Sequence, residues 1–309
     1  MGVRDLNFLI KRYNRTSIRE MSLQGLKGKR IAVDIQLYLY KALLQGRCPI
    51  EYIHSQILHL ERCRVVPVYV FDGRPPVEKM DEIQKRQVRR SRSLEVIQYL
   101  ETKVWSALSN ASTPTASTVG EGDLLRDAVG ASTNDSVILE KINELKRNVV
   151  SIHHKTKQAI RYLCNIMGVR YVEDSEYEAD QLIGMMYRNG EIDGCISEDN
   201  DMLVYGCPKL YRFYKLNSNY IVEYDLPSIL DDLDLTPSQF IDLCILCGND
   251  YYKKFRYTIG NDVYPLKNSV LAYYLIKKYN SIDTMDVLKK EYIPDTLDYA
   301  RLREIYTIG

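Results

Sequence analysis

Short continuous runs of apolar residues alternate along the chain with longer stretches whose apolar positions recur at helical spacing. The continuous runs, typical of buried parallel strands, lie at 29–35, 66–71, 169–172 and 194–196. Alternation of strands with helices predicts a parallel sheet joined by right-handed crossovers. The pattern therefore predicts an α/β fold, with a central, mostly parallel sheet and helices on both faces.

The same periodicity predicts the remaining elements. Helices are expected at 6–13, 36–44, 50–62, 77 to about 108, 137–167, 176–188, 237–248 and 268–279. Apolar runs at 210–214 and 220–224 are expected to form a hairpin that closes the sheet, and the polar residues between 13 and 29 a linker. The stretch 109–136 is rich in Ser, Thr, Ala, Gly and Asn, which favours a loop or a disordered insertion.

Composition limits the class of protein. A chain of 309 residues suits one large α/β domain or two smaller ones. Seven cysteines and a polar N-terminus favour a reducing, intracellular location, and no segment is apolar enough to span a membrane. Cys244 and Cys247 form a C-x-x-C in an apolar helix without a second metal-binding pair, so we expect them in the core.

Carboxylates gather where predicted elements end. Glu176 and Glu178 form one i, i+2 pair at the start of a helix, and Asp199 and Asp201 form another after a strand. The other three element-end acids are Asp34, Asp72 and Asp250. Acids at the carboxyl edge of a parallel sheet repel one another, so a hard divalent cation is the natural compensator. The alternative is that they are solvated acids at helix N-termini.

Two divalent ions would return four positive charges to these seven acids. Two such ions about 3.5–4 Å apart, bridging a phosphate, can hydrolyse a phosphodiester bond. Competing chemistries find little support, because the sequence contains neither a P-loop nor a G-x-S-x-G motif, and Leu203 interrupts any EF-hand pattern.

The predicted helix after residue 77 is strongly basic. Five cations crowd its middle: Lys85, Arg86, Arg89, Arg90 and Arg92. Residues 83–94 contain no acid, and helical spacing places Lys79, Arg86 and Arg90 on one face. A net charge of only +1 means that this basic zone is balanced by acidic zones elsewhere. We expect the face to guide a single nucleic-acid strand. The alternative is a solvated helix with i, i+4 pairs between Asp81 and Lys85 and between Glu82 and Arg86.

Six motifs in order carry a family resemblance: MGVRDL, VDIQLYLY, VYVFDGRPP, SEYEAD, SEDNDM and DLCILCGNDY. With them the sequence resembles the flap endonuclease family of structure-specific 5′ nucleases over most of residues 1–252. It looks like the short, divergent members typical of large DNA viruses. The resemblance implies a 5′-nuclease (PIN-like) fold that cuts DNA at 5′ flaps or 5′ ends in replication, repair or recombination, at a nuclear or cytoplasmic replication site.

The resemblance also implies roles for single residues. It assigns two Mg²⁺ ions, which Mn²⁺ can replace, to Asp34, Asp72, Glu176, Glu178, Asp199, Asp201 and Asp250. Catalysis would rest on Lys79 and Arg86 at the phosphate together with Asp34, Asp72, Glu176 and Asp199. DNA would contact Gly2, Tyr40, Arg89, Arg90 and Arg92.

The implied organisation has two domains. Residues 1–252 would form the catalytic domain, with a helical arch and flexible insertion at 77–150, and residues 253–309 a helical DNA-binding extension. There the family's helix-hairpin-helix is altered to FRYTIGNDVYPLKNSVLAYYLIKKY, which puts duplex contact in question. We expect a monomer without a terminal clamp-binding peptide. A 5′–3′ exoribonuclease and an inactive DNA-binding scaffold remain the alternatives.

Overall fold

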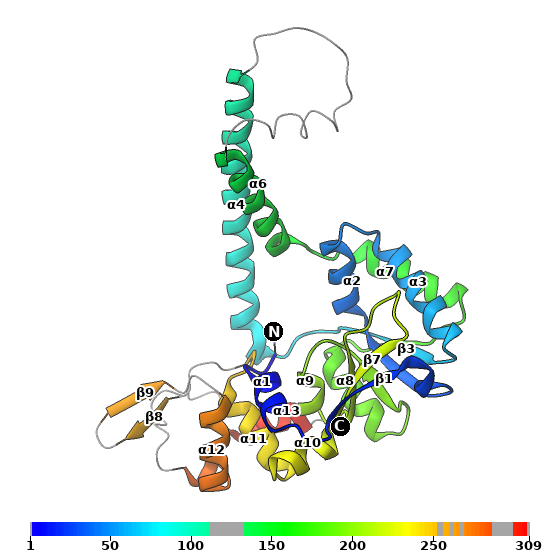
Figure 1. The fold of residues 1–309 in the computed structure, drawn as a ribbon, viewed down its shortest axis with the longest axis vertical. Helices are drawn as coiled ribbons and strands as arrows, with labels where there is room; N and C mark the ends of the chain where they lie inside the picture. Colours follow the sequence, from blue (N-terminus) through cyan, green and yellow to red (C-terminus); the bar gives the residue numbers. More distant parts are fainter. Residues whose placement is uncertain are drawn as a thin grey trace. The chain divides into compact units, whose positions relative to one another are not determined.

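The structure, a computed structural model, describes residues 2–111, 133–251, 256–259, 262–265, 269–285 and 299–307 (Figure 1). The chain divides into two compact units. The first combines Met1–Met80 with His153–Gly309, and the second is Asp81–Ile152. Thus the expected extension at 253–309 falls in the same unit as the sheet.

A seven-stranded sheet with the order β1-β7-β6-β5-β2-β3-β4 forms the centre of the first unit. The strands are β1 (Ile18–Ser22), β2 (Arg30–Asp34), β3 (Val66–Phe71), β4 (Tyr171–Glu173), β5 (Gly194–Ile196), β6 (Lys209–Arg212) and β7 (Tyr220–Asp225). The five strands from β6 to β4 are parallel, and β7 is antiparallel to both of its neighbours. The predicted mostly parallel sheet, closed by a β6–β7 hairpin, is confirmed.

Helices cover both faces of this sheet (Figure 1). One group contains α2 (Ile35–Leu44), α3 (Pro49–Arg62) and α7 (His154–Ile166). The other contains α1 (Leu6–Tyr13), α8 (Ala179–Arg188), α10 (Leu226–Leu233), α11 (Pro237–Cys247), α12 (Ser269–Tyr279) and α13 (Tyr299–Thr307). Because successive side chains of a strand point to opposite faces, Ala32 packs with the second group while its buried neighbours Ile31 and Val33 face the first.

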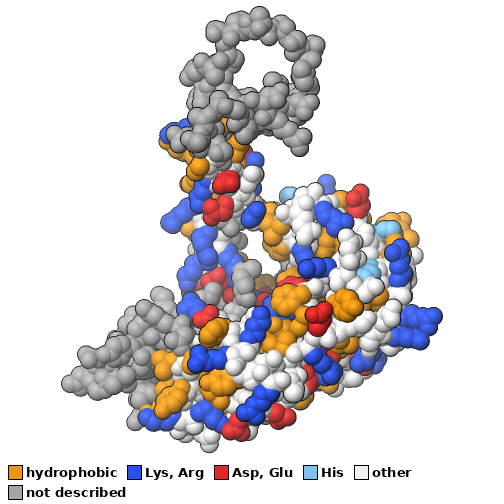
Figure 2. Space-filling view, in the orientation of Figure 1, with side chains coloured by type: hydrophobic (Ala, Val, Ile, Leu, Met, Phe, Trp, Pro, Cys, Tyr) orange, Lys and Arg blue, Asp and Glu red, His pale blue; other side chains and the backbone are white. Residues whose placement is uncertain are grey.

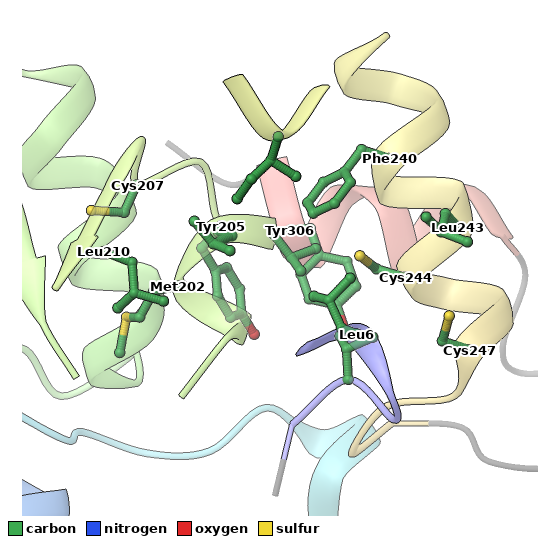
Figure 3. Close-up of a cluster of buried hydrophobic side chains, with 14 of the residues drawn as sticks. Leu6, Met202, Tyr205, Cys207, Leu210, Phe240, Leu243, Cys244, Cys247 and Tyr306 are labelled. Atoms are coloured by element: carbon green, nitrogen blue, oxygen red, sulfur yellow. The ribbon is translucent and has the colours of Figure 1, made fainter. Parts of the chain in front are cut away.

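The core of the second group is continuous from the sheet to the last helix. Figure 3 shows Tyr306 of α13 among Leu6 of α1 and Phe240 and Cys244 of α11. Cys244 and Cys247 are 0% and 6% exposed, so their predicted core position is confirmed. The C-terminal helix is therefore part of the main hydrophobic core.

Two parts of this unit differ from the sequence-based expectation. The supposed polar linker contains β1, an edge strand, and the 3-10 helix η1 (Leu23–Leu26). Between α11 and α12 the chain forms an antiparallel pair, β8 (Arg256–Ile259) and β9 (Asp262–Pro265), so the prediction of a wholly helical 253–309 is wrong there. These strands escaped prediction because polar residues interrupt their apolar alternation, as edge strands permit. The expected turn glycine, Gly260, lies outside the described residues.

The second unit contains α4 (Met80–Ala111) from Asp81 onward and α6 (Thr133–Val149). The 3-10 helix η2 (Val77–Lys79), just before α4, belongs to the first unit. An ion pair joins Lys146 to Glu101 (Nζ to Oε1, 2.9 Å). The expected loop at 109–136 is helical at both described ends, and residues 112–132 lie outside the described part. The helix expected at 137–167 is two helices, α6 and α7. Within the described ranges, we find no helix with the length and apolar character needed to cross a membrane.

Candidate active site

The first two carboxylates of the site follow neighbouring parallel strands. Asp34 ends β2 and caps α2, its Oδ1 accepting the Leu37 N–H at 3.4 Å. Its Oδ2 accepts the hydroxyl of Ser197, the residue after β5, at 3.3 Å. Asp72 follows β3 and accepts the N–H of Ala179, the first residue of α8, at 3.0 Å. Strand adjacency thus brings the starts of α2 and α8 together at one edge of the sheet.

A capping box fixes the next carboxylates at the start of α8. Glu178 is the N-cap, its side chain accepts the N–H of Gln181, and the Gln181 side chain accepts the Glu178 N–H at 3.0 Å. Asp180 lies in the first turn of this helix. Because the capping box fixes where α8 begins, it also fixes the side of the helix on which Asp180 lies.

The structure brings Asp180 into the acidic cluster and leaves Glu176 outside it. Burial, followed by the charges of Asp199 and Asp34, raises the pKa of Asp180 well above its ordinary value. Glu176 is exposed in the preceding loop, where its N–H donates to Asp174 Oδ1 at 2.7 Å. The E-x-x-Q capping box was the sequence signal that could have identified Asp180, because it starts the helix at Glu178.

The third loop, between β5 and the short helix α9 (Asp201–Val204), carries Asp199 and Asp201. The Asp201 N–H donates to Asp199 Oδ1 at 3.1 Å, and the Val3 N–H donates to Asp201 Oδ1 at 2.6 Å. Gly2 has φ +98°, and a Cβ built on it would lie 2.3 Å from Asp199 Oδ1. The N-terminus is thus packed directly on this acid pair, and only glycine fits at its second position.

A buried arginine holds the same loop from the opposite side. Arg212, 8% exposed, donates through Nη1 to the side-chain oxygens of Asn200 at 2.7 Å and Asn7 at 3.1 Å. Its Nε lies 3.8 Å from Oε2 of Glu198, and the next N–H, of Phe213, donates to Glu198 Oε1 at 3.0 Å. Both neighbours of Asp199 are therefore anchored to the end of β6.

Lys79 places a positive charge among the acids. Its Nζ donates to both carboxylate oxygens of Glu178, at 2.8 and 2.9 Å, and lies 3.9 Å from Asp250 Oδ2. Burial disfavours the charged ammonium, but Glu178 and Asp180 outweigh it and raise the pKa of Lys79. The neighbouring Glu78 is paired with Arg301 of α13 at 2.8 Å, which ties the C-terminal helix to this turn.

The cluster holds more negative charge than this lysine can balance. Burial, and next the charge of Asp72, raise the pKa of Asp34 to about 7. Burial, and next Asp199, raise the pKa of Asp201 well above its ordinary value. Oxygen-only donors that repel one another at neutral pH suit a hard divalent cation. As they stand, however, no three His, Cys, Asp or Glu side chains of the described residues are arranged to hold a metal ion.

Tyr251, the residue after Asp250, packs in a group of three tyrosines. The hydroxyls of Tyr251 and Tyr205 lie 2.5 Å apart, and both rings contact the ring of Tyr306, with centroids 5.9 and 5.1 Å away. Tyr205 and Tyr306 appear side by side in Figure 3. The C-terminal helix thus supports the last acid of the cluster from within the core.

The expected DNA contacts lie on separate elements. Tyr40 on α2 is 38% exposed. On α4 in the second unit, Glu82 accepts from Arg86 at 3.2 Å and from Arg89 at 3.1 Å, so the expectation that these cations lack local partners is wrong for both. Glu82 lies one residue before the acid-free stretch, and an i, i+4 or i, i+7 partner can reach back to it.

Two further cations of α4 differ from Arg86 and Arg89 in having no ion-pair partner among the described residues. Arg90 and Arg92 are exposed and form no ion pair with the residues that the structure describes. Figure 2 shows Lys and Arg side chains recurring along the second unit. Lys79 belongs to η2, in the first unit, and Arg86 to α4, in the second, so their expected alignment on one helical face stays a prediction.

Two family models match the chain and include each residue placed in the cluster. The XPG N-terminal domain matches residues 1–93, and the XPG I-region matches residues 168–250. Together they cover more than half of the sequence. The residues between them, 94–167, correspond to most of the second unit and the whole of α7.

Similar proteins match over nearly the whole chain. Flap endonuclease 1 of Candida tropicalis is 28% identical over 99% of this chain and 76% of its own length, and that of Encephalitozoon cuniculi is 28% identical over 99% and 81%. Among solved structures, the catalytic core of Rad2 in complex with DNA substrate has a TM-score of 0.65 at 19% identity, covering 100% of this chain and 87% of that one. The flap endonuclease-1 of Methanococcus jannaschii has a TM-score of 0.58 at 20% identity, covering 99% and 84%.

Proposed function

Because the chain belongs to the flap endonuclease family, with its XPG N-terminal and I-region domains, we propose that it is a divalent-metal-dependent 5′ nuclease that hydrolyses phosphodiester bonds in DNA at 5′ flaps or 5′ ends. The observation that supports this best is the gathering of buried and half-buried carboxylates around Lys79 at the carboxyl edge of the sheet. We infer a role in replication, repair or recombination from the family alone.

The environment of Asp180, close to the charges of Asp199 and Asp34, supports one change to the expected ligand set. We propose Asp180 in place of Glu176, so that the set is Asp34, Asp72, Glu178, Asp180, Asp199, Asp201 and Asp250, some binding directly and others through water. Two bound Mg²⁺ or Mn²⁺ ions would supply a nucleophilic water and stabilise charge on the leaving oxygen. Glu176, exposed and outside the cluster, has no assigned part in catalysis.

The chain's own residues would orient the reaction. Asp72 and Glu178 fix the start of α8, while Arg212 and the Val3 N–H hold the loop of Asp199 and Asp201. The Lys79 ammonium is placed to stabilise negative charge on a phosphate at this edge. On the basis of the family, Arg86 would do the same, while Arg89, Arg90, Arg92 and Tyr40 would contact the substrate.

The test is cleavage of three end-labelled substrates with Mg²⁺: a 5′-flap duplex, a nicked duplex and single-stranded RNA. The proposal expects cleavage of the flap near its junction and release of products from 5′ ends. Cleavage of RNA in preference to both DNA substrates would indicate an exoribonuclease, and binding without cleavage would indicate a scaffold. Either result would overturn the proposed function.

A further inference from the structure

The start of the chain is strongly basic, and little of that charge is neutralised. Residues 2–19 contain five cations and one acid. Arg4, Lys11 and Arg12 are exposed and form no ion pair with any residue in the described ranges. Phe8, between them, is 57% exposed. Phe8 is thus an exposed aromatic ring that lies between exposed cations in the sequence.

Helical spacing places three of these side chains on one side of α1 (Leu6–Tyr13), and Arg4 lies just before the helix. Phe8, Lys11 and Arg12 follow at i, i+3 and i+4, the spacing of neighbours on a helix surface. On the inner side, Leu6, Leu9 and Ile10 are at most 1% exposed. Packing of that apolar side therefore holds the basic row outward. We call Arg4, Phe8, Lys11 and Arg12 the α1 row.

One end of the α1 row adjoins the acidic cluster. Gly2 and Val3, just before Arg4, pack on Asp199 and Asp201. The Arg4 N–H donates to the carbonyl of Gly248 at 3.0 Å, two residues before Asp250. Since two residues span about 7 Å at most, Arg4 lies within that distance of the Gly2 contact. Nucleic acid held at the cluster would pass within reach of its side chain.

Both ends of α1 contact α12. The Ser269 hydroxyl donates to the carbonyl of Asp5 at 3.1 Å, and the rings of Tyr13 and Tyr273 pack with centroids 4.8 Å apart. These contacts join both ends of α1 to the body of the first unit. The α1 row is therefore rigidly placed relative to the carboxylates.

From this placement we propose that the α1 row binds the DNA backbone beside the scissile phosphodiester, with Phe8 stacking on an unpaired base. The cations offset the repulsion between phosphates and the carboxylates, and an aromatic side chain between cations is the arrangement that binds unpaired strands. The inference rests on the proposed function, because it takes the carboxylate cluster as the cleavage site.

A charge-matched comparison tests the cations. One variant combines Arg4→Gln, Lys11→Gln and Arg12→Gln. Its control combines Lys27→Gln, Lys29→Gln and Arg62→Gln, three exposed cations without ion pairs in the described structure, next to the amino-terminal ends of β2 and β3. Both change the net charge by the same amount at opposite edges of the sheet. Affinity for 5′-flap DNA is measured in Ca²⁺ over a salt series.

The α1 variant should bind about tenfold more weakly or worse, and its slope of log affinity against log salt should fall by about 0.7–0.9 for each phosphate that it no longer binds. The control variant should lose much less affinity, and its salt slope should change much less. Equal effects of the two variants would show that only overall charge matters, and would overturn the inference. Circular dichroism and melting curves confirm that both variants fold.

A second comparison tests the aromatic ring. Phe8→Ser should weaken binding of flap DNA by about fivefold or more, while Phe8→Tyr keeps a stacking ring and should bind as the wild type does. Phe8→Ser should weaken the binding of fully paired duplex less than the binding of flap DNA. Loss of affinity with Phe8→Tyr equal to that with Phe8→Ser, or no loss with either, would overturn the stacking role. Binding is measured in Ca²⁺, without cleavage. If the wild type did not cleave DNA in Mg²⁺, that result would contradict the proposed function, while the binding comparison would still test the stacking role of Phe8.

Discussion

The guanidinium of Arg212 donates a hydrogen bond of 2.7 Å to the side chain of Asn200, the residue between Asp199 and Asp201. Arg212 also binds Asn7 of α1, whose side-chain oxygen accepts the Tyr224 hydroxyl at 2.9 Å. The loop that carries two of the proposed metal ligands is thus tied to β6, β7 and α1 together. Such outer contacts set how well a site's ligands are oriented.

Replacing Arg212 should weaken metal binding more than it weakens the fold. We expect Arg212→Met to raise the Mg²⁺ concentration needed for half-maximal cleavage by about 10- to 100-fold. The control, Arg303→Met, breaks the 2.6 and 2.8 Å bonds to Asp242 in the C-terminal core. It should lower the melting temperature without changing the Mg²⁺ requirement. An unchanged requirement in Arg212→Met would refute the positioning role.

Lys79 should matter for the rate of cleavage rather than for binding. We expect Lys79→Ala to lower the single-turnover rate at saturating DNA by about 10²- to 10³-fold, because its ammonium would stabilise charge that develops on the phosphate. Arg89→Ala, on α4, should weaken binding and lower its salt dependence instead. Normal cleavage by saturated Lys79→Ala would remove Lys79 from the catalytic group.

Gly2 should be essential for a steric reason. In Gly2→Ala the new Cβ would collide with Asp199 and Asp201, displacing the pair. Gly28→Ala is a matched control, because Gly28 also has a positive φ, +77°, but has no atom within 4 Å of the added Cβ. Both variants should lose about 1 kcal/mol of stability from backbone strain, and only Gly2→Ala should lose most of its cleavage activity. Equal activities would show that the steric clash is unimportant.

The buried acids should destabilise the protein when metal is removed. At pH 8, above the pKa of about 7 for Asp34, we expect Asp34→Asn to raise the melting temperature in EDTA, because it removes one of several repelling charges. Adding Mg²⁺ should stabilise the wild type more than this variant. Differential scanning calorimetry with and without Mg²⁺ measures both effects. A lower melting temperature for Asp34→Asn in EDTA would contradict them.

The strands and helices that position the site were largely predictable because buried parallel strands are continuously apolar. The apolar run at Val66–Phe71 corresponds to β3, and that at Gly194–Ile196 to β5. Short edge strands such as β1 carry too many polar residues for this signal. Asp180 was missed because acids on either side of Glu178 have the same i, i+2 spacing, and only the exact start of α8 decides between them. Long-range partners such as Arg212 and Asn7 have no local sequence signal at all.

The sharpest test of the metal-dependent cluster compares Asp180→Asn with Glu176→Gln. Each substitution removes one carboxylate from the same short segment, but only the half-buried Asp180 lies in the acidic cluster, while Glu176 is exposed. Single-turnover cleavage of 5′-flap DNA is measured over a Mg²⁺ series, together with the Ca²⁺-induced shift in melting temperature. We predict that Asp180→Asn nearly abolishes cleavage and reduces the shift, while Glu176→Gln behaves as the wild type. Loss of cleavage in Glu176→Gln with normal activity in Asp180→Asn would contradict the proposed ligand set.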